Sequence, residues 1–161
     1  MNYDPEIHHR RSIRLKDYDY SQNGFYFITI CIEGKRCLLG RVNDDEVILS
    51  SVGEGVLKEW RDLPQRFVHV ELGEFVIMPN HIHGILHFSG QKEQGRSSLG
   101  EVVGAFKSLC FRHYKDDGGI GHLWQRNYYE HIIRCPQSHG EITWYIHTNP
   151  MRWREDDLYM P

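Results

Sequence analysis

The sequence has no long apolar run, no paired cysteines and no internal repeat. A membrane span needs roughly 18 consecutive apolar residues and a signal peptide needs an apolar core, and neither pattern is found. The four cysteines are scattered without a C-x-x-C pair, which argues against a zinc knuckle or a disulfide framework. We therefore expect a cytoplasmic protein that contacts no membrane and forms one domain over residues 1–161.

The chain also lacks an excess of positive charge, because 19 lysines and arginines face 22 acidic residues. This balance alone argues mildly against a nucleic-acid-binding protein. A basic arm at residues 1–20 can nevertheless bind phosphates, since acidic residues are concentrated elsewhere, at 44–46 and 155–157. Basic arms are also common as solvated tails, so both roles stay open. The basic residues that we single out in the arm are Arg10, Arg11, Arg14 and Lys16.

The pattern of apolar segments predicts an α+β fold. Residues 25–32 are aromatic and β-branched without polar alternation, which indicates a central strand buried on both faces. Several hairpins with interleaved helices imply an antiparallel sheet with helices on one face. The polar residues 89–98 are expected to form a mobile loop within the domain. The other predicted strands are 38–42, 47–49, 67–72, 74–88 with a break near Pro79, and 123–134, and capping boxes predict helices that begin at Ser51, Ser98 and Ser138.

The most informative motif is His81-Ile82-His83, which follows the apolar run 75–80. Two side chains at positions i and i+2 of an extended segment point to the same face of a strand. Two imidazoles on one face suit a divalent metal that is held by two ring nitrogens. His-x-His pairs are also common on half-exposed strand faces, so a second segment must support the metal site.

The second segment is 144–150, in which Tyr145 and Asn149 precede Pro150. These two residues share one stripe of a predicted helix with two isoleucines. Tyr145 is equally compatible with a core aromatic, and Asn149 with a C-terminal cap of the helix. If the stripe faces the sheet, two imidazoles, a carboxamide oxygen and a phenol converge on one point.

Such a set of groups has a specific chemical use. His81, His83 and Asn149 can hold Mn²⁺ or Mg²⁺ and leave positions open for substrate oxygens. Tyr145 can then attack a phosphodiester and form a covalent intermediate that preserves the bond energy for rejoining. A phenol with a pKa of about 10 is a poor nucleophile at neutral pH, so the metal must assist it.

In combination and in this order, the motifs resemble the single-tyrosine HUH transposases of the IS200-like group, and in particular their REP-associated tyrosine transposase branch. The resemblance spans nearly the whole chain. It is carried by MPNHIHG at 78–84, WQRNYYEH at 124–131 and YIHTNP at 145–150, and the basic opening 8–15 is also similar to that branch.

The resemblance implies a ferredoxin-like fold and a metal-dependent enzyme that nicks and rejoins single-stranded DNA containing palindromic hairpins. It implies that His81, His83 and Asn149 are the metal ligands, although relatives commonly offer glutamine as the third. Tyr145 would be left joined to the 5′ phosphate, with a 3′ hydroxyl released. Relatives act either as dimers, with the tyrosine of one chain serving the other, or within a single chain, so monomer and homodimer both stay open.

Three further points concern the choice of nucleophile, the function and the DNA contacts. Tyr128 and Tyr129 are rival nucleophiles that we interpret as packing or base-stacking residues, and His87 as an ordinary surface histidine. There are two alternative functions. One is a metal-dependent hydrolase that activates water, and the other is a domesticated protein that binds hairpins without cleaving them. The predicted nucleic-acid contacts are Arg10, Arg11, Arg14, Lys16, Lys107, Arg112 and Arg126.

Overall fold

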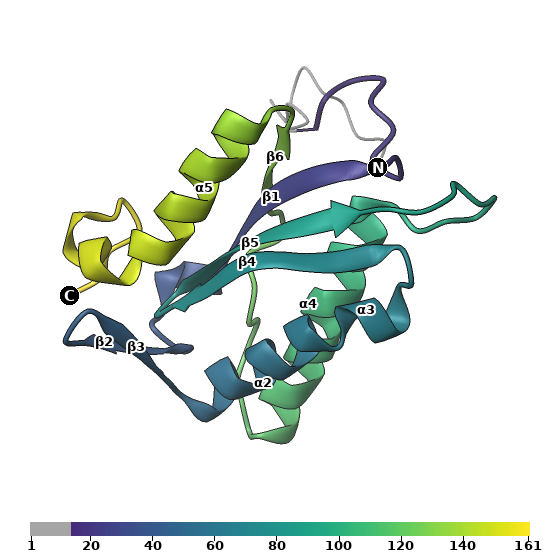
Figure 1. Ribbon diagram of the computed structural model, residues 1–161. Helices are drawn as coiled ribbons and strands as arrows, with labels where there is room; N and C mark the ends of the chain where they lie inside the picture. The colour runs from purple at the N-terminus through teal and green to yellow at the C-terminus, as the bar shows by residue number, and fades with distance from the viewer. Residues whose placement is uncertain (1–13) are drawn as a thin grey trace, which may run out of the picture.

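The computed structural model describes residues 14–161, which fold around one four-stranded antiparallel sheet (Figure 1). Its strand order, β4-β5-β1-β6, places β1 and β5 in the centre and is that of a ferredoxin-like fold, so the predicted α+β class is confirmed. Arg10 and Arg11 lie outside the described residues. The strands are β1 (Gly24–Cys31), β2 (Gly40–Asn43), β3 (Glu46–Leu49), β4 (Val70–Met78), β5 (His81–Phe88) and β6 (Tyr129–Ile133). The helices are α2 (Ser51–Arg61), α3 (Leu63–Arg66), α4 (Leu99–Asp116) and α5 (Pro136–Thr148), with 3-10 helices η1 (Glu33–Lys35) and η2 (Pro150–Glu155).

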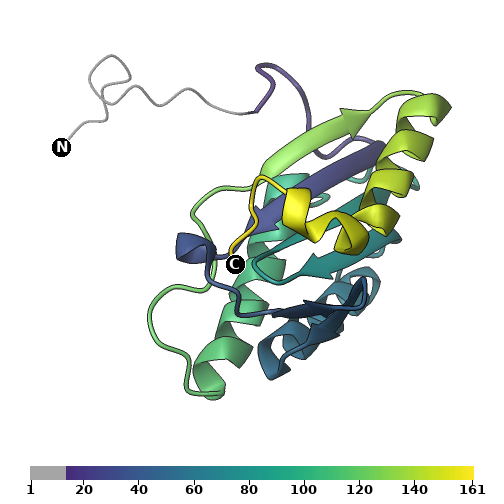
Figure 2. The ribbon, with the colours of Figure 1, turned by 90° about the vertical axis from the view of Figure 1, so that its left-hand side faces the viewer.

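Helices cover both faces of the sheet, so the expectation of helices on one face is wrong (Figures 1 and 2). On one face, α2 and α4 pack over a large core that includes Tyr26 and Leu86. On the other, α5 covers a smaller cluster that includes Phe27 and Ile85. The physical reason is that β1 is apolar on both sides and Ile85 of β5 adds to its second face, and each apolar face must be buried against another element.

The hairpin that carries the His-x-His motif has its turn directly before His81. The prediction of strands at 67–72 and 74–88 is wrong, because Gly73 lies inside β4, at a register shift between Leu72 and Phe75, and does not end it. Pro79 and Asn80 form the turn between β4 and β5. His81 therefore opens β5, paired with Met78 of β4 and Cys31 of β1.

Two of the three serines predicted to cap a helix are not its N-cap. The capping box at Ser98 is present, with Glu101 bonded back to the Ser98 backbone. The N-cap of α2 is Ser50 and not Ser51, and α5 begins at Pro136 with Cys135 as its N-cap, so Ser138 lies inside that helix. In both cases the residue directly before the helix, Ser50 or Cys135, has an extended backbone, and its side chain accepts a hydrogen bond from a backbone N–H of the first turn. No helix in the range 14–161 is both long and apolar enough to cross a bilayer.

An aromatic stack packs against β5 on the face opposite to the imidazoles. The rings of Trp60 and Phe75 stack with centroids 4.2 Å apart. A Cβ atom at Gly84 would lie 2.5 Å from Cη2 of Trp60, so a side chain there would displace the indole. Gly84 therefore lets α2 pack against the strand directly beside His83, and this contact supports the geometry of the motif.

Candidate active site

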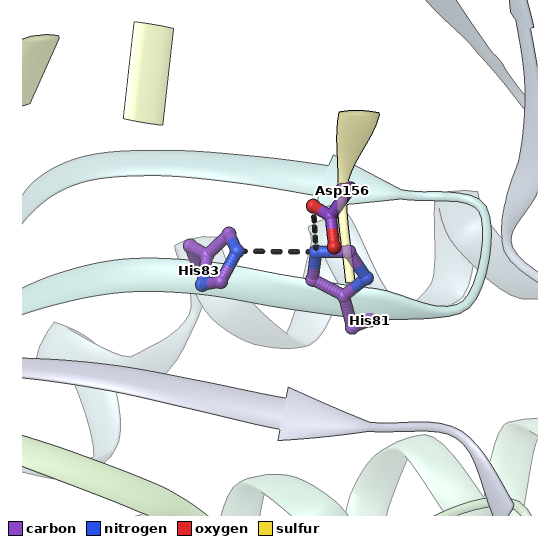
Figure 3. A group of neighbouring side chains, drawn as sticks. All are labelled: His81, His83 and Asp156. Atoms are coloured by element: carbon purple, nitrogen blue, oxygen red, sulfur yellow. Dashed lines mark hydrogen bonds and ion pairs between the residues drawn. The ribbon is translucent and has the colours of Figure 1, made fainter. Parts of the chain in front are cut away.

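The two imidazoles of the motif face each other within the protein interior. His81 and His83 point from β5 to the same side of the sheet, as the strand alternation requires (Figure 3). Their Nε2 atoms are 3.1 Å apart, and both residues are buried. The sequence-based placement of these two side chains on one face is therefore correct.

Each imidazole is oriented by a hydrogen bond at its other nitrogen. The side-chain nitrogen of Asn80 donates to the carbonyl oxygens of Lys35 and Leu158, so its Oδ1 accepts from Nδ1 of His81 at 2.8 Å. This assignment leaves Nε2 of His81 with a free lone pair. Nδ1 of His83 shares a 2.7 Å hydrogen bond with the hydroxyl of Thr29. A hydroxyl can donate or accept, so Thr29 is compatible with either tautomer of His83.

Helix α5 brings both of its predicted site residues to the imidazoles. The Tyr145 hydroxyl lies 3.3 Å from Nε2 of His83, and the ring is 39% exposed. Asn149 is buried at the end of the helix, and its Oδ1 has no hydrogen-bond partner among residues 14–161. The four groups expected to converge therefore do so. A pocket of about 160 Å³ opens beside them, lined by Tyr145, Asn149 and Asp156 among others.

Asp156 joins this cluster, and the sequence analysis missed it. Its Oδ2 lies 3.6 Å from Nε2 of His81 (Figure 3). The ligand atoms of His81, His83 and Asp156 all lie within 4.8 Å of one another. The sequence identifies 155–157 only as acidic residues away from the basic arm, and nothing in their spacing points to the histidine motif. Thr29 had a weak signal, as the only aliphatic hydroxyl in the run 25–32.

The residues present fit a divalent cation. Two nitrogens that bind one ion at about 2.1 Å are separated by about 3.0–3.4 Å for bond angles between about 90° and 109°. The observed 3.1 Å between the Nε2 atoms lies in this range. A buried amide oxygen without a hydrogen bond and a carboxylate beside it supply the oxygen ligands that hard cations prefer. A cation would also satisfy the Asn149 oxygen, which otherwise carries a desolvation penalty.

The electrostatics of the pocket keep both imidazoles and the Tyr145 phenol neutral at pH 7. Burial lowers the pKa of His81 to about 4, against the opposing effects of the Asp156 charge and the Asn149 amide. Burial, followed by the charge of His81, lowers the pKa of His83 well below its usual value. Neutral imidazoles are the form that binds metals. Burial raises the pKa of the Tyr145 phenol, which the Asn149 amide partly offsets.

The predicted nucleic-acid contacts fall into two groups. Lys16, Arg112 and Arg126 are exposed. Arg14 and Lys107 have contacts within the chain. The Arg14 guanidinium lies 3.7 Å from the centre of the Tyr128 ring and 3.7 Å from a carboxylate oxygen of Glu130. The Lys107 ammonium is half-buried and donates to the backbone carbonyls of Gln125 and Arg126, at 2.6 and 3.2 Å.

The two rival tyrosines are separated by the sheet. Tyr129 pairs with Thr29, which pairs in turn with His83, so all three lie in one cross-strand row. Tyr129 is largely exposed there, whereas the Tyr128 ring packs with the core on the other face, beneath Arg14. His87 stacks on Phe25 with centroids 4.1 Å apart and pairs with a glutamate, as expected of a surface histidine.

The described residues form an α+β domain whose fold is also that of solved transposases. No family model matches the sequence. An uncharacterised protein of Haemophilus influenzae is 41% identical over 175 residues, which cover 98% of this chain and 97% of that protein. The chain belongs to the same family as this protein.

Curated and solved relatives confirm the resemblance to REP-associated tyrosine transposases. The protein of that name from Escherichia coli is 23% identical over 83% of this chain and 70% of its own length. A REP-associated tyrosine transposase bound to a REP hairpin superposes with a TM-score of 0.60 at 18% identity, covering 86% of this chain and 73% of that one. A putative transposase from Deinococcus radiodurans has a TM-score of 0.51 at 18% identity, with coverage of 83% and 94%.

Proposed function

We propose that this protein is a metal-dependent, single-tyrosine transposase that nicks and rejoins single-stranded, hairpin-forming DNA. The observation that carries the proposal is the position of the Tyr145 hydroxyl, 3.3 Å from a histidine of a buried cluster of metal-ligating groups. A phenol is a weak nucleophile, and metal-ligating groups beside it can supply the activation that it lacks, while its 39% exposure leaves it accessible to a substrate.

The ligands of the metal are His81, His83, Asn149 and Asp156, of which the last is added by the tertiary structure. When bound, Mg²⁺ or Mn²⁺ polarises the scissile phosphodiester and stabilises the charge that develops on it. Asn80 and Thr29 hold the imidazoles in place from behind, so that their Nε2 atoms stay directed at the ion.

Tyr145 is the nucleophile. Its phenol oxygen bonds to phosphorus while the bond from phosphorus to the 3′ oxygen of the preceding nucleotide breaks. The phenol loses one proton and the departing 3′ oxygen gains one. The products are a 5′-phosphotyrosine and a 3′ hydroxyl, and attack by a 3′ hydroxyl on the phosphotyrosine reverses the step and rejoins the strand. Asn149 hydrogen-bonds to the Tyr145 backbone carbonyl at 3.5 Å, which links the nucleophile to a ligand.

The reaction takes place within one chain. Tyr145, both imidazoles, Asn149 and Asp156 all belong to the same described chain and already lie together. No partner tyrosine is required to complete the cluster, so a monomer is sufficient for strand cleavage.

The partner is a hairpin with a single-stranded extension. A solved structural neighbour is bound to a REP hairpin, which supports this substrate class. Tyr129 and Trp144 are exposed on the α5 side of the molecule and offer faces on which unpaired bases can stack. Arg152 lines the pocket next to Tyr145 and adds a positive charge for a phosphate.

The test is incubation with a labelled hairpin oligonucleotide and Mn²⁺, followed by denaturing electrophoresis. A protein–DNA adduct that resists denaturation, and that maps to Tyr145 by peptide mass spectrometry, supports the proposal. Cleavage without an adduct selects the metal-dependent hydrolase that activates water. Tight hairpin binding with neither product selects a domesticated, non-cleaving protein.

A further inference from the structure

Arg96, in the loop between β5 and α4, has a buried guanidinium without a hydrogen bond. All three of its side-chain nitrogens are inaccessible to solvent and have no partner among residues 14–161. The position is set by the backbone, because Gly95 has a φ of +82° and the Arg96 amide donates to the carbonyl of Glu93 at 3.3 Å. An unpaired, buried cation is unfavourable, so an anion that drew the guanidinium into the adjoining pocket would relieve this penalty.

The groups around Arg96 leave its charge uncompensated. Its guanidinium carbon lies 5.7 Å from the centre of the Phe88 ring, a weak cation–π contact that satisfies none of its five N–H donors. Glu93 lines the same pocket but forms no ion pair with Arg96 in the described part of the chain. The nearby Lys92 is paired with Asp19.

The pocket beside Arg96 is open and rich in polar groups. Its volume is about 360 Å³. Arg66 adds a second guanidinium, which shares its charge with Glu59 at 3.2 Å, and Nε2 of His69 lies 3.1 Å from the carbonyl of Ser97. The lining residues that can contact an anion are Arg66, His69, Arg96 and Ser97, whereas the Ser89 hydroxyl donates to Glu71.

This pocket is separate from the candidate active site. It lies at the end of β5 where Phe88 is found, whereas His81 opens the same strand. At about 3.3 Å per residue, these ends are about 23 Å apart. Phe88 also belongs to the core beneath α2 and α4, on the face opposite to the imidazoles.

We propose that this pocket is a phosphate-binding site, in which Arg96 is the principal ligand. A guanidinium presents two parallel N–H donors that match two oxygens of a phosphate group, and the hydroxyl of Ser97 can complete the contacts. Rotation about the side-chain bonds of Arg96 brings its guanidinium to the pocket that it lines. The phosphate belongs either to a nucleic-acid backbone or to a free anion. The site does not depend on the chemistry of Tyr145.

The first experiment uses inorganic phosphate as the probe and measures the thermal unfolding of the full chain against chloride at equal ionic strength. The wild type should be stabilised saturably, by about 5–10 °C at a phosphate concentration about a hundredfold above Kd. Arg96→Met should lose this shift, with affinity reduced about tenfold or more. In chloride alone it should unfold at or above the wild-type temperature, because an unpaired charge is removed. Arg96→Gln carries the test if the methionine variant does not fold.

The matched control is Arg61→Met, which removes an exposed arginine at the end of α2 that does not line the pocket, and which should retain the full phosphate shift. A wild type that responds equally to phosphate and chloride, or an Arg96→Met variant that keeps the wild-type shift, overturns the proposal. A second measurement identifies the source of the phosphate. If a hairpin oligonucleotide competes with phosphate and binds Arg96→Met more weakly, the ligand is a nucleic-acid backbone. If the hairpin does not compete, the ligand is a free anion.

Discussion

The Asp156 carboxylate lies 3.6 Å from Nε2 of His81, and the segment that carries Asp156 is hydrogen-bonded to Asn80, the residue before that histidine. The side-chain amide of Asn80 donates to the Leu158 carbonyl at 2.7 Å, while its oxygen accepts from His81. The buried Asn80 side chain therefore orients the His81 imidazole and also holds the segment after η2 next to that imidazole by a hydrogen bond. The acidic ligand and the imidazole are in this way positioned by the same side chain.

Asp156→Asn should weaken divalent-cation binding about tenfold or more, because a charged oxygen ligand is replaced by a neutral one. The measurement is Mn²⁺ binding followed by electron paramagnetic resonance, with the metal-dependent rise in unfolding temperature as a second readout. Asp157→Asn is the matched control, since that carboxylate is exposed and adjacent in sequence. Equal losses in the two variants would show that only general negative charge matters.

His81→Ala and His83→Ala should each lose Mn²⁺ binding and DNA cleavage together, because the remaining ligands cannot hold the ion firmly. Asn149→Ala should reduce both less severely, since water can replace one neutral oxygen ligand. The comparison requires calorimetry and a cleavage assay on the same preparations. Undiminished cleavage by the double-histidine variant would rule out the metal site.

Tyr145→Phe should abolish the covalent adduct and leave hairpin affinity nearly unchanged. The ring is 39% exposed and loses only the hydroxyl contact with His83, so the cost in stability should be about 1 kcal/mol or less. Gel assays report the adduct, and fluorescence anisotropy reports binding. Tyr129→Phe is the matched variant, because Tyr129 lies on the same face of the sheet and should keep the adduct. An adduct that persists in Tyr145→Phe would move the nucleophile to another tyrosine.

Gly84→Ala should destabilise the protein by about 1–3 kcal/mol, because the new methyl group would overlap the Trp60 indole. Chemical denaturation measures the loss. Gly104→Ala provides the contrast, since Gly104 lies on the exposed side of α4 with nothing within 4 Å of a new Cβ, and this change should stabilise by about 0.5–1 kcal/mol. A neutral Gly84→Ala would mean that the Trp60–Phe75 stack adjusts freely.

Neutralising Arg10 and Arg11 should weaken hairpin binding and flatten its dependence on salt, because fewer counterions are released from the DNA. Arg14 is better left intact in this experiment, since it packs on Tyr128. Binding is measured by anisotropy over a range of salt concentrations, against a blunt duplex as competitor. Unchanged salt dependence in the double variant, or equal affinity for duplex and hairpin, would contradict this role of the arm.

Local sequence carried enough information to predict the central strand, the hairpin of β2 and β3, the shared face of His81 and His83, and the shared stripe of Tyr145 and Asn149. These features depend on alternation along a strand and on the repeat of a helix, which are properties of neighbouring residues. The capping box at Ser98 is local for the same reason. The chemistry of the site was predictable to that extent.

Only the tertiary structure decided which residues from distant segments complete the site. Thr29 reaches His83 because β1 pairs with β5 in one particular register, and Asp156 reaches His81 because the chain after α5 folds back to Asn80. The packing of α5 on the face opposite to α2 and α4 is likewise a matter of burying two apolar faces of one sheet. Periodicity identifies an apolar face, but the partner that buries it is selected by packing over the whole chain.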